Sequence, residues 1–504
     1  MKKMDILFMQ QEEPSTAKIN VDYLDDIGVD RFKGLLSDDE YTVLRKYLLK
    51  PLKDISIINE RQQVFKDFLA NPGFAEKLRD CCLIASENKM PVYRKGYTTI
   101  PIAQRLIDYL NVLQKSFKVI EELLEIVSNS NNDFNSRFIN DLKMQLNKKD
   151  EFERIKEEVV DIVKYISCDG VELGIEYGVT FKYKSARIIS YGNMNILPNK
   201  PVFFSRKKAL PNTYEIDSQT HLQIGYIYEA AAYSVCSIMS HLNSHIVTTC
   251  QVLAQQLLMY ISGLKIISRL RTVCTDMVFP EFEVVSEQTL VFQDLYDMGL
   301  IVEGAQVVPN DFHSSTSSLN IISGVNQGGK TTFIKSIGFA QLFAQCGFPV
   351  IARKYVCSIF NGLFTHFPKE EDERMELGKF AEELARFRNN INIFACRSLV
   401  LMNESFAATS DIESADIAFD ILRALADTAP MLFYVTHNDV LLKGLDKLQD
   451  SFGSATELRS LITLSEESQI ERVYKIVTGV PQIDINTRNF LNHVVMTLSR
   501  DNEC

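Results

Sequence analysis

Apolar residues in the first half of the chain recur at the spacing of an α-helix. Between residues 102 and 127 they step by three or four positions, and the same spacing continues over residues 152–166 and 226–271. Side chains three and four positions apart lie on one face of a helix, so each run predicts a long helix, the last with room for an interruption. The polar segment 128–132 predicts a turn between the first two runs. The first half is therefore expected to contain long helices packed against one another.

The pattern changes after Pro280 to short apolar runs separated by segments with helical spacing. This alternation is typical of a parallel β-sheet covered by helices. Three runs predict strands, at residues 319–323, 398–402 and 431–436, and each is followed by polar or glycine-containing sequence. Ligands of such folds bind at the carboxyl ends of the strands, so the functional chemistry is expected at these three points.

The segment after the first predicted strand reads Gly-Val-Asn-Gln-Gly-Gly-Lys-Thr-Thr and contains the complete pattern Gly-x-x-x-x-Gly-Lys-Thr. Glycines allow successive backbone N–H groups to turn towards phosphate oxygens, and the positive end of the following helix adds to this attraction. Lys330 is expected to reach the β- and γ-phosphates of a nucleotide, and Thr331 to hold Mg²⁺. The predicted phosphate loop consists of Gly324, Val325, Asn326, Gln327, Gly328, Gly329, Lys330, Thr331 and Thr332.

The second predicted strand ends in Asn403 and Glu404. P-loop ATPases hold the metal with an acidic side chain at such a strand tip and use a further residue to orient the attacking water. Glu404 is expected to polarise that water and to lie near the metal, and Asn403 to occupy the metal's outer shell. Because asparagine stands where an aspartate is expected, the site loses one negative charge. Slow hydrolysis is the predicted consequence.

Two further segments complete the predicted site. His437 follows the third strand and is expected to hydrogen-bond the γ-phosphate, so that the predicted catalytic residues are Lys330, Glu404 and His437. Gly378 opens a predicted helix that continues through residues 383–387. A glycine and a lysine at a helix N-terminus make an anion site, which is useful if it faces a nucleotide held by a second subunit.

Composition narrows the class of protein. The net charge of −11 argues against a surface that follows a nucleic-acid backbone throughout, although a local basic groove is compatible with it. The 10 cysteines include no Cys-x-x-Cys pair, so they indicate neither a disulfide framework nor a zinc site. No signal peptide and no stretch of about 20 apolar residues is evident. A cytoplasmic protein without membrane contact is predicted.

Together these motifs resemble the MutS proteins of DNA mismatch repair, specifically a short MutS-like branch. The phosphate loop is similar to the family's Gly-Pro-Asn-Met-Gly-Gly-Lys-Ser-Thr, and Pro309-Asn310-Asp311 precedes it. Residues 399–404, 409–410 and 436–437 follow in the family's order, and residues 48–62 look like the start of its core, or lever, domain. The resemblance implies that the nucleotide is ATP and that Asn310 contributes to its site.

The resemblance also implies a domain organisation. It predicts a multidomain protein with an α-helical core (lever) domain followed by an α/β P-loop NTPase domain of the ABC and MutS type. The expected boundaries are an N-terminal segment at 1–29, a helical core at 30–275 with a reduced clamp at 165–225, and an ATPase domain at 276–504. The mismatch-recognition and connector domains of full MutS proteins are not expected. A terminal helix is expected around residues 490–498.

The implied function is a MutS-like ATPase that hydrolyses ATP with Mg²⁺ in a dimer and thereby drives conformational change on DNA, mismatched or otherwise structured. The mate is the same chain or a homologous one, and Gly378 is expected to reach its nucleotide in trans. The alternative is a nucleotide-gated protein-interaction switch with little hydrolysis, which Asn403 favours somewhat. A transporter ATPase subunit is disfavoured because of the long helical half and the lack of a Leu-Ser-Gly-Gly-Gln stretch.

Overall fold

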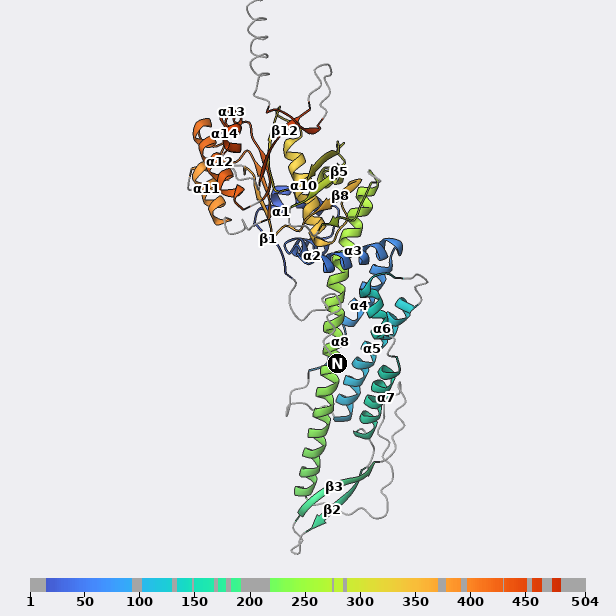
Figure 1. Cartoon of the computed structure of the whole chain (residues 1–504). Coiled ribbons are helices and arrows are strands. Elements are labelled where there is room, and N and C mark those ends of the chain that lie inside the picture. The colour runs from blue at the N-terminus through green and yellow to red at the C-terminus, as the bar shows by residue number, and fades with distance from the viewer. Residues whose placement is uncertain are drawn as a thin grey trace, which may run out of the picture. The chain divides into compact units, whose positions relative to one another are not determined.

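The computed structural model divides the chain into two compact units of different architecture (Figure 1). The sheet unit combines Leu7–Ala70 with Leu258–Cys504, and the helical unit combines Met1–Ile6 with Asn71–Leu257. The structure describes residues 15–92, 102–128, 134–146, 149–166, 171–177, 183–191, 218–273, 276–283, 288–369, 378–390, 397–428, 430–450, 456–464 and 474–481.

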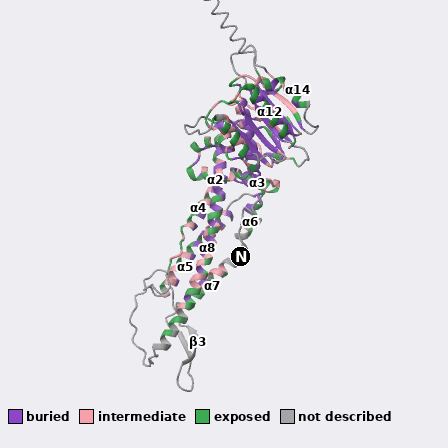
Figure 2. Ribbon diagram, turned by 90° about the vertical axis from the view of Figure 1, so that its left-hand side faces the viewer, coloured by how far each residue is buried: buried purple, intermediate pink, exposed green. Residues whose placement is uncertain are grey.

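The sheet unit is built on a seven-stranded sheet. In spatial order its strands are β1 (Lys18–Ile19), β9 (Gly362–His366), β10 (Ser398–Asn403), β11 (Met431–Val435), β7 (Ser318–Ser323), β12 (Glu457–Thr463) and β13 (Ile476–Thr478). All neighbouring strands are parallel except β12 and β13, which are antiparallel. Every residue of β7, β9, β10 and β11 is buried, and Figure 2 shows buried strands in purple beside α12. Strands covered on both faces form continuous apolar runs, and the prediction of a mainly parallel sheet with three of its strands is confirmed.

Helices cover both faces of this sheet. A Cβ added to Gly338 of α10 (Lys330–Cys346) would lie 2.9 Å from Cδ1 of Leu401, so α10 approaches the sheet closely on that face. Val400 and Met402 belong instead to a cluster with α12 (Asp411–Ala426), α13 (Asp439–Lys443) and α14 (Leu445–Asp450). Successive side chains of a strand point to opposite faces, which places α10 and α12 on opposite sides of β10.

A second, four-stranded sheet lies beside the start of α10. Its spatial order is β4 (Glu281–Phe282), β8 (Lys354–Cys357), β5 (Leu290–Leu295) and β6 (Asn310–Ser314), with α9 (Met298–Val302) between β5 and β6 in the chain. The ring of Phe292 stacks on that of Phe312, with centroids 5.7 Å apart. It also lies 6.2 Å from the ring of Phe333, in the first turn of α10. Aromatic packing therefore fixes the helix that follows the phosphate loop.

Residues 15–70 form a segment that belongs to the sheet unit. This segment contains β1, α1 (Tyr23–Ile27), the 3-10 helix η1 (Val29–Gly34), α2 (Asp38–Leu48) and α3 (Ile55–Ala70). The hydroxyl of Tyr23 donates to the carbonyl of Gly338 on α10 at 3.1 Å. The ring of Phe32 lies 5.6 Å from that of Phe339, also on α10. Because this segment buries its apolar face against α10, the compact units do not follow the predicted boundaries at residues 29 and 275, which stay predictions about family domains.

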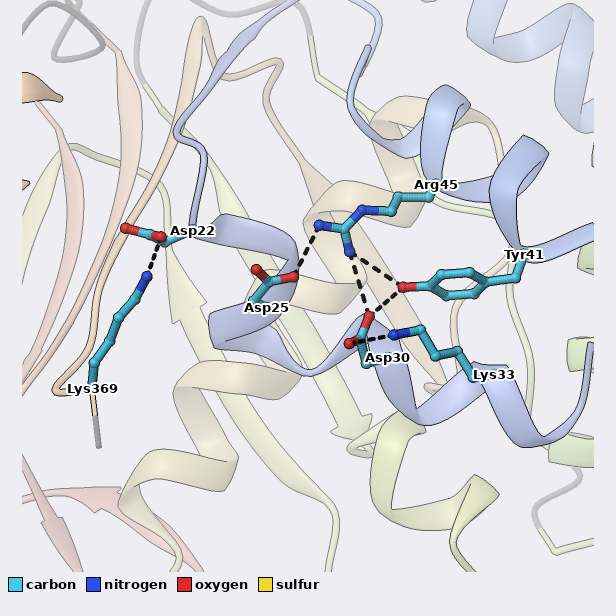
Figure 3. A network of polar contacts seen from close by, with 7 residues as sticks. All are labelled: Asp22, Asp25, Asp30, Lys33, Tyr41, Arg45 and Lys369. Atoms are coloured by element: carbon cyan, nitrogen blue, oxygen red, sulfur yellow. Dashed lines mark hydrogen bonds and ion pairs between the residues drawn. The ribbon is translucent and has the colours of Figure 1, made fainter. Parts of the chain in front are cut away.

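Charged side chains add contacts at the surface of the same segment (Figure 3). Arg45 of α2 bonds to Asp25 at 3.0 Å and to Asp30 at 3.4 Å. Asp22 pairs with Lys369, which follows β9. Exposed ion pairs each contribute roughly 0.2–1 kcal/mol, so the apolar contacts with α10 are the main attachment.

The helical unit confirms the long predicted helices. It contains α4 (Phe74–Ser86), α5 (Ile102–Ser128), α6 (Arg137–Leu146), α7 (Lys149–Ile166), most of α8 (Ser218–Arg271) and the antiparallel pair β2 (Val171–Tyr177) and β3 (Tyr183–Tyr191). α8 is continuous over 54 residues, without the interruption that the sequence allowed. The sequence missed α6, which lies between the first two predicted helices. Its 10 residues give a shorter periodic pattern than its neighbours.

Polar contacts join the helices of this unit. The hydroxyl of Ser116 on α5 donates to the side chain of Asn243 on α8 at 2.6 Å. Asn243 in turn donates to the carbonyl of Asn88, after α4, at 2.8 Å. Residues Glu229–Arg271 of α8 are long and apolar enough to cross a membrane, but 72% of their most apolar 18-residue stretch is buried inside the protein. Packing as a core helix therefore accounts for their apolar character.

Candidate nucleotide-binding site

The predicted phosphate loop lies between the end of β7 and the start of α10. Its backbone has positive φ at Gly324 (+128°), Gln327 (+60°) and Gly329 (+88°). Alternation of right- and left-handed residues turns consecutive N–H groups towards one side, which makes a concave anion site. α10 begins at Lys330, so its positive N-terminal end adds to the attraction. This backbone could bind phosphate.

Two glycines of this loop are required by close packing. A Cβ on Gly324 would lie 2.1 Å from Oγ1 of Thr463, at the end of β12. A Cβ on Gly328 would lie 2.7 Å from Cγ2 of the same threonine. β12 runs parallel to β7, so its last residue lies against the outside of the loop. Thr463 was not predicted as part of the site, because it lies far from the loop along the chain.

Lys330 and Thr331 lie where the predicted phosphate and metal contacts would form. The Lys330 ammonium donates to the carbonyls of Gly324 at 2.9 Å and Val325 at 2.8 Å, and the residue is only 5% exposed. A desolvated ammonium group held inside the loop attracts phosphate strongly. The hydroxyl of Thr331 donates to Oδ1 of Asn403 at 3.0 Å. The first turn of α10 and the tip of β10 therefore face each other.

The oxygen donors at this point fit Mg²⁺, which prefers hydroxyl, carbonyl and carboxylate oxygens. The hydroxyl of Thr331 and the amide oxygen of Asn403 are neutral, and the nearby acid, Glu404, is the next residue of the chain. Asn403 is 7% exposed and close enough to Thr331 to share a metal's hydration shell. The residues present can accept Mg²⁺, with less negative charge than an aspartate at position 403 would supply.

Glu404 and His437 are brought together by the pairing of β10 with β11. Oε1 of Glu404 lies 3.4 Å from Nε2 of His437, and both side chains are partly exposed. The hydrogen bond from His437 lowers the pKa of Glu404, and the charges of His437 and Lys330 act in the same direction, against the effect of burial. Glu404 is therefore a carboxylate at neutral pH, as a residue that polarises water must be.

Asn310 lies beside the loop but uses its side chain to hold β13. It accepts from the backbone N–H of Ile476 at 2.8 Å and donates to the carbonyl of Tyr474 at 3.3 Å. A Cβ on Gly329 would lie 3.4 Å from the Tyr474 ring. Its predicted role in nucleotide binding stays a prediction, since the contacts found here position Tyr474 against the loop. Tyr474 was not predicted as part of the site.

Gly378 is the N-cap of α11 (Lys379–Asn389), as the sequence predicted for the start of this helix. It is exposed, and a Cβ added to it would meet no atom within 4 Å. Its role in trans concerns a second chain and stays a prediction. Asn326 and Gln327 are exposed at the loop, while Thr332 is half-buried in the first turn of α10.

Two predicted features fall wholly or partly outside the described residues. The terminal helix around residues 490–498 lies outside them. Within the predicted clamp at 165–225, the structure describes β2, β3, the end of α7 and the start of α8, while residues 167–170, 178–182 and 192–217 lie outside the described residues.

Comparison with protein families gives two matches. The model of MutS domain V matches residues 320–485, which include the phosphate loop, Glu404 and His437. The model of the MutS2 N-terminal domain matches residues 53–273, which include the helices from α3 to α8.

Individual relatives match over about a third of the chain. An Endonuclease MutS2 of Streptococcus equi subsp. equi is 28% identical over 177 residues, which are 34% of this chain and 22% of that protein. The DNA mismatch repair protein MSH3 of Kluyveromyces lactis is 31% identical over 155 residues, which are 29% of this chain and 15% of that protein. The match thus spans about a fifth or less of the length of these relatives.

Proposed function

Because the chain belongs to the MutS family, we propose that it binds ATP with Mg²⁺ and hydrolyses it in a dimer to drive conformational change on DNA. The observation that carries the proposal is the convergence of three motifs at one edge of the sheet. Neighbouring strands β7, β11 and β10 end at the phosphate loop, at His437 and at Glu404. A sheet with a purely structural role does not need the phosphate loop, His437 and Glu404 at one edge.

Each residue has a role that follows from its position. The loop amides and Lys330 would bind the β- and γ-phosphates, Thr331 would hold Mg²⁺, and Asn403 would lie in the metal's outer shell. Bound Mg²⁺ neutralises charge on the phosphate oxygens. Glu404, ionised at neutral pH, accepts a hydrogen bond from the attacking water, and His437 orients Glu404 and contacts the γ-phosphate.

Turnover of the wild type beside Glu404→Gln tests the hydrolytic part. We expect the variant to bind ATP with Mg²⁺ as the wild type does, because the amide keeps the size of the carboxylate. Its turnover is expected to fall by roughly 100-fold or more, since general bases contribute about 10²–10⁴ to the rate. Wild-type protein free of bound nucleotide that shows no affinity for ATP would contradict the whole proposal.

The dimer is tested by complementation between two inactive variants. Lys330→Ala removes the ammonium of a chain's own site, while Gly378→Glu places a carboxylate at the helix that we assign to the partner's nucleotide. A mixture of the two chains can form one intact composite site in each mixed dimer. We expect activity to reappear on mixing, and two-fold assembly with a nonhydrolysable ATP analogue. A mixture that stays inactive while assembling would exclude Gly378 from the partner's site.

DNA binding is proposed from the family and needs its own test, because the net charge of −11 opposes it. Duplex, branched and mismatched DNA would be titrated at several salt concentrations. Binding that weakens linearly on a logarithmic scale as salt rises would indicate phosphate contacts by a local basic surface. Absence of binding even at low salt would remove DNA from the proposal and leave the ATPase intact.

A second candidate function is a nucleotide-gated switch that engages another protein and hydrolyses little. Asn403 favours it, because a neutral amide holds the metal less strongly than a carboxylate. Single-turnover measurements over hours, with protein in excess of ATP, separate the two functions. Stable ATP binding without cleavage would support the switch.

A further inference from the structure

The three residues after β10 form a turn with unusual backbone, called the 404–406 turn. Glu404 has φ of +46° and Phe406 has φ of +65°. Both residues carry side chains that clash with the backbone in this region, so such conformations persist only where surrounding contacts impose them. The first residue of the turn is the carboxylate proposed to polarise water. Whatever holds the turn therefore sets the direction of that carboxylate.

Strands β9 and β11 hold the middle of the turn. The hydroxyl of Tyr434 on β11 donates to the carbonyl of Ser405 at 3.0 Å. Oγ of Ser405 lies 3.1 Å from the carbonyl of His366 on β9 and 2.8 Å from its Nδ1. Because β9, β10 and β11 are neighbours in one sheet, these contacts are fixed by strand register.

Helix α11 holds the end of the turn through one carboxylate. The backbone N–H of Phe406 donates to Oε1 of Glu383 at 2.7 Å. The Glu383 side chain is only 10% exposed, so water competes weakly for this bond. Burial and the charge of Arg386 lower the pKa of His366 to about 4, so this histidine is neutral at neutral pH and forms no ion pair with Glu383. The contact of this carboxylate with the turn is therefore a hydrogen bond from the Phe406 N–H.

Glu383 differs from the other contacts because α11 is not part of the sheet. Gly378 caps the same helix, five residues before Glu383, and is the point proposed to meet the partner's nucleotide. A hydrogen bond from α11 to Phe406 therefore connects that helix to the turn that begins with Glu404. The ring of Phe387, also on α11, lies 5.4 Å from that of Phe406 and supports the same contact.

We infer that Glu383 is a positioning residue for hydrolysis: by accepting the Phe406 N–H it holds the 404–406 turn so that Glu404 points towards His437 and the phosphate loop. Glu383 itself does not touch the nucleotide. The inference rests on the proposed ATPase function, to which it adds a residue outside the three motifs.

Three variants test this role. Glu383→Ala removes the acceptor, Glu383→Gln keeps an amide oxygen that can accept the same N–H, and Glu382→Ala removes a neighbouring carboxylate of the same helix as a control. We expect Glu383→Ala to lower kcat by roughly 10–100-fold, because small misplacements of a catalytic group cost up to about 10²-fold. The kcat of Glu383→Gln is expected to stay within a few-fold of the wild-type value. The kcat of Glu382→Ala is expected to equal that of the wild type.

Three readouts separate positioning from a loss of folding. ATP affinity and the thermal midpoint are expected to change little in Glu383→Gln, and ATP affinity to change less than about two-fold in Glu383→Ala. In a Glu404→Gln background, Glu383→Ala should cause no further loss, since the group being positioned is already disabled.

The outcomes distinguish this inference from the proposed function. Wild type that hydrolyses ATP while Glu383→Ala hydrolyses it equally fast would overturn the positioning role and leave the ATPase standing. An additive loss in the Glu404→Gln background would also overturn it. Wild type that does not cleave ATP would overturn the hydrolysis proposal and this inference together.

Discussion

The phosphate loop and the 404–406 turn lie at the same edge of the sheet but maintain unusual backbone in different ways. In the loop, two of the three positive φ values belong to glycines, Gly324 and Gly329, which adopt them without steric cost. In the turn they belong to Glu404 and Phe406, which do not. The loop therefore carries its conformation in its own sequence, whereas the turn depends on contacts from α11, β9 and β11.

The largest expected effect breaks the loop from within. Gly324→Ala places a Cβ 2.1 Å from Oγ1 of Thr463 at a φ of +128°. The loop must shift, so we expect ATP affinity to fall by roughly 100-fold or more, a free-energy change of about 3 kcal/mol. Binding of a fluorescent ATP analogue measures it.

Two companions of Gly324→Ala sharpen its interpretation. Gly34→Ala, where a Cβ meets no atom within 4 Å, should leave affinity unchanged. Adding Thr463→Ala to Gly324→Ala removes the closest clash and should restore part of the ATP affinity. The remaining loss is the cost of holding an alanine at a φ of +128°. Affinity in Gly324→Ala equal to wild type would show that the loop tolerates a side chain at this position.

The same contrast explains what sequence could predict. The loop, the strands β7, β10 and β11, and the order of Glu404 and His437 were predictable because glycine pattern and apolar runs are local properties. Thr463, Tyr474 and Glu383 were not, because each meets the site only through folding of distant segments. The placement of residues 15–70 was missed for a related reason. Their apolar spacing predicts helices but does not identify α10 as the surface that covers them.

A change at Phe406 tests the turn that tertiary contacts hold. Phe406→Gly relieves the positive φ but removes a fully buried ring that packs against His366 and Phe387. Loss of the ring costs about 3–5 kcal/mol and relief of the backbone returns about 1, so we expect a net destabilisation of roughly 2–4 kcal/mol. The free energy of unfolding of the sheet unit, measured by titration with denaturant in both proteins, would test this expectation. A more stable variant would mean that strain, rather than packing, dominates the turn.

The pH dependence of stability isolates one of the turn's contacts. His366 has its pKa lowered to about 4 from 6.5, first by burial, so its contribution is fully present above pH 6.5 and is lost as pH falls towards 4. At about 1.4 kcal/mol per pKa unit, the difference between 6.5 and about 4 amounts to roughly 3–4 kcal/mol. Burial raises the pKa of Asp26 to about 6, which acts in the opposite direction. The contribution of Asp26 to stability is lost as pH rises through 6.

Comparison of the wild type with His366→Asn removes the influence of Asp26, which both proteins share. The asparagine amide can still face Ser405 but does not titrate. We expect the difference in unfolding free energy between the two proteins to change across pH 4–6.5 and to be constant above it. Parallel pH profiles would show that His366 does not titrate in this window. Residues 324–332 of the phosphate loop include neither a histidine nor a carboxylate. The ATP affinities of the two proteins should therefore depend on pH in the same way.

The smallest expected effect concerns the residue that joins the two regions. Asn403 ends the strand before the 404–406 turn and contacts Thr331, the residue after Lys330, at 3.0 Å. Asn403→Asp adds a charge next to the proposed metal position without altering either backbone, so we expect turnover to rise roughly tenfold, or about 1.4 kcal/mol of barrier. The concentration of Mg²⁺ that gives half-maximal turnover should fall at the same time. Asn438→Asp adds the same charge one residue after His437, where the side chain caps α13 instead of facing Thr331, and should leave both quantities unchanged. If both variants respond equally, the gain comes from general electrostatics and the contact with Thr331 is not the metal position.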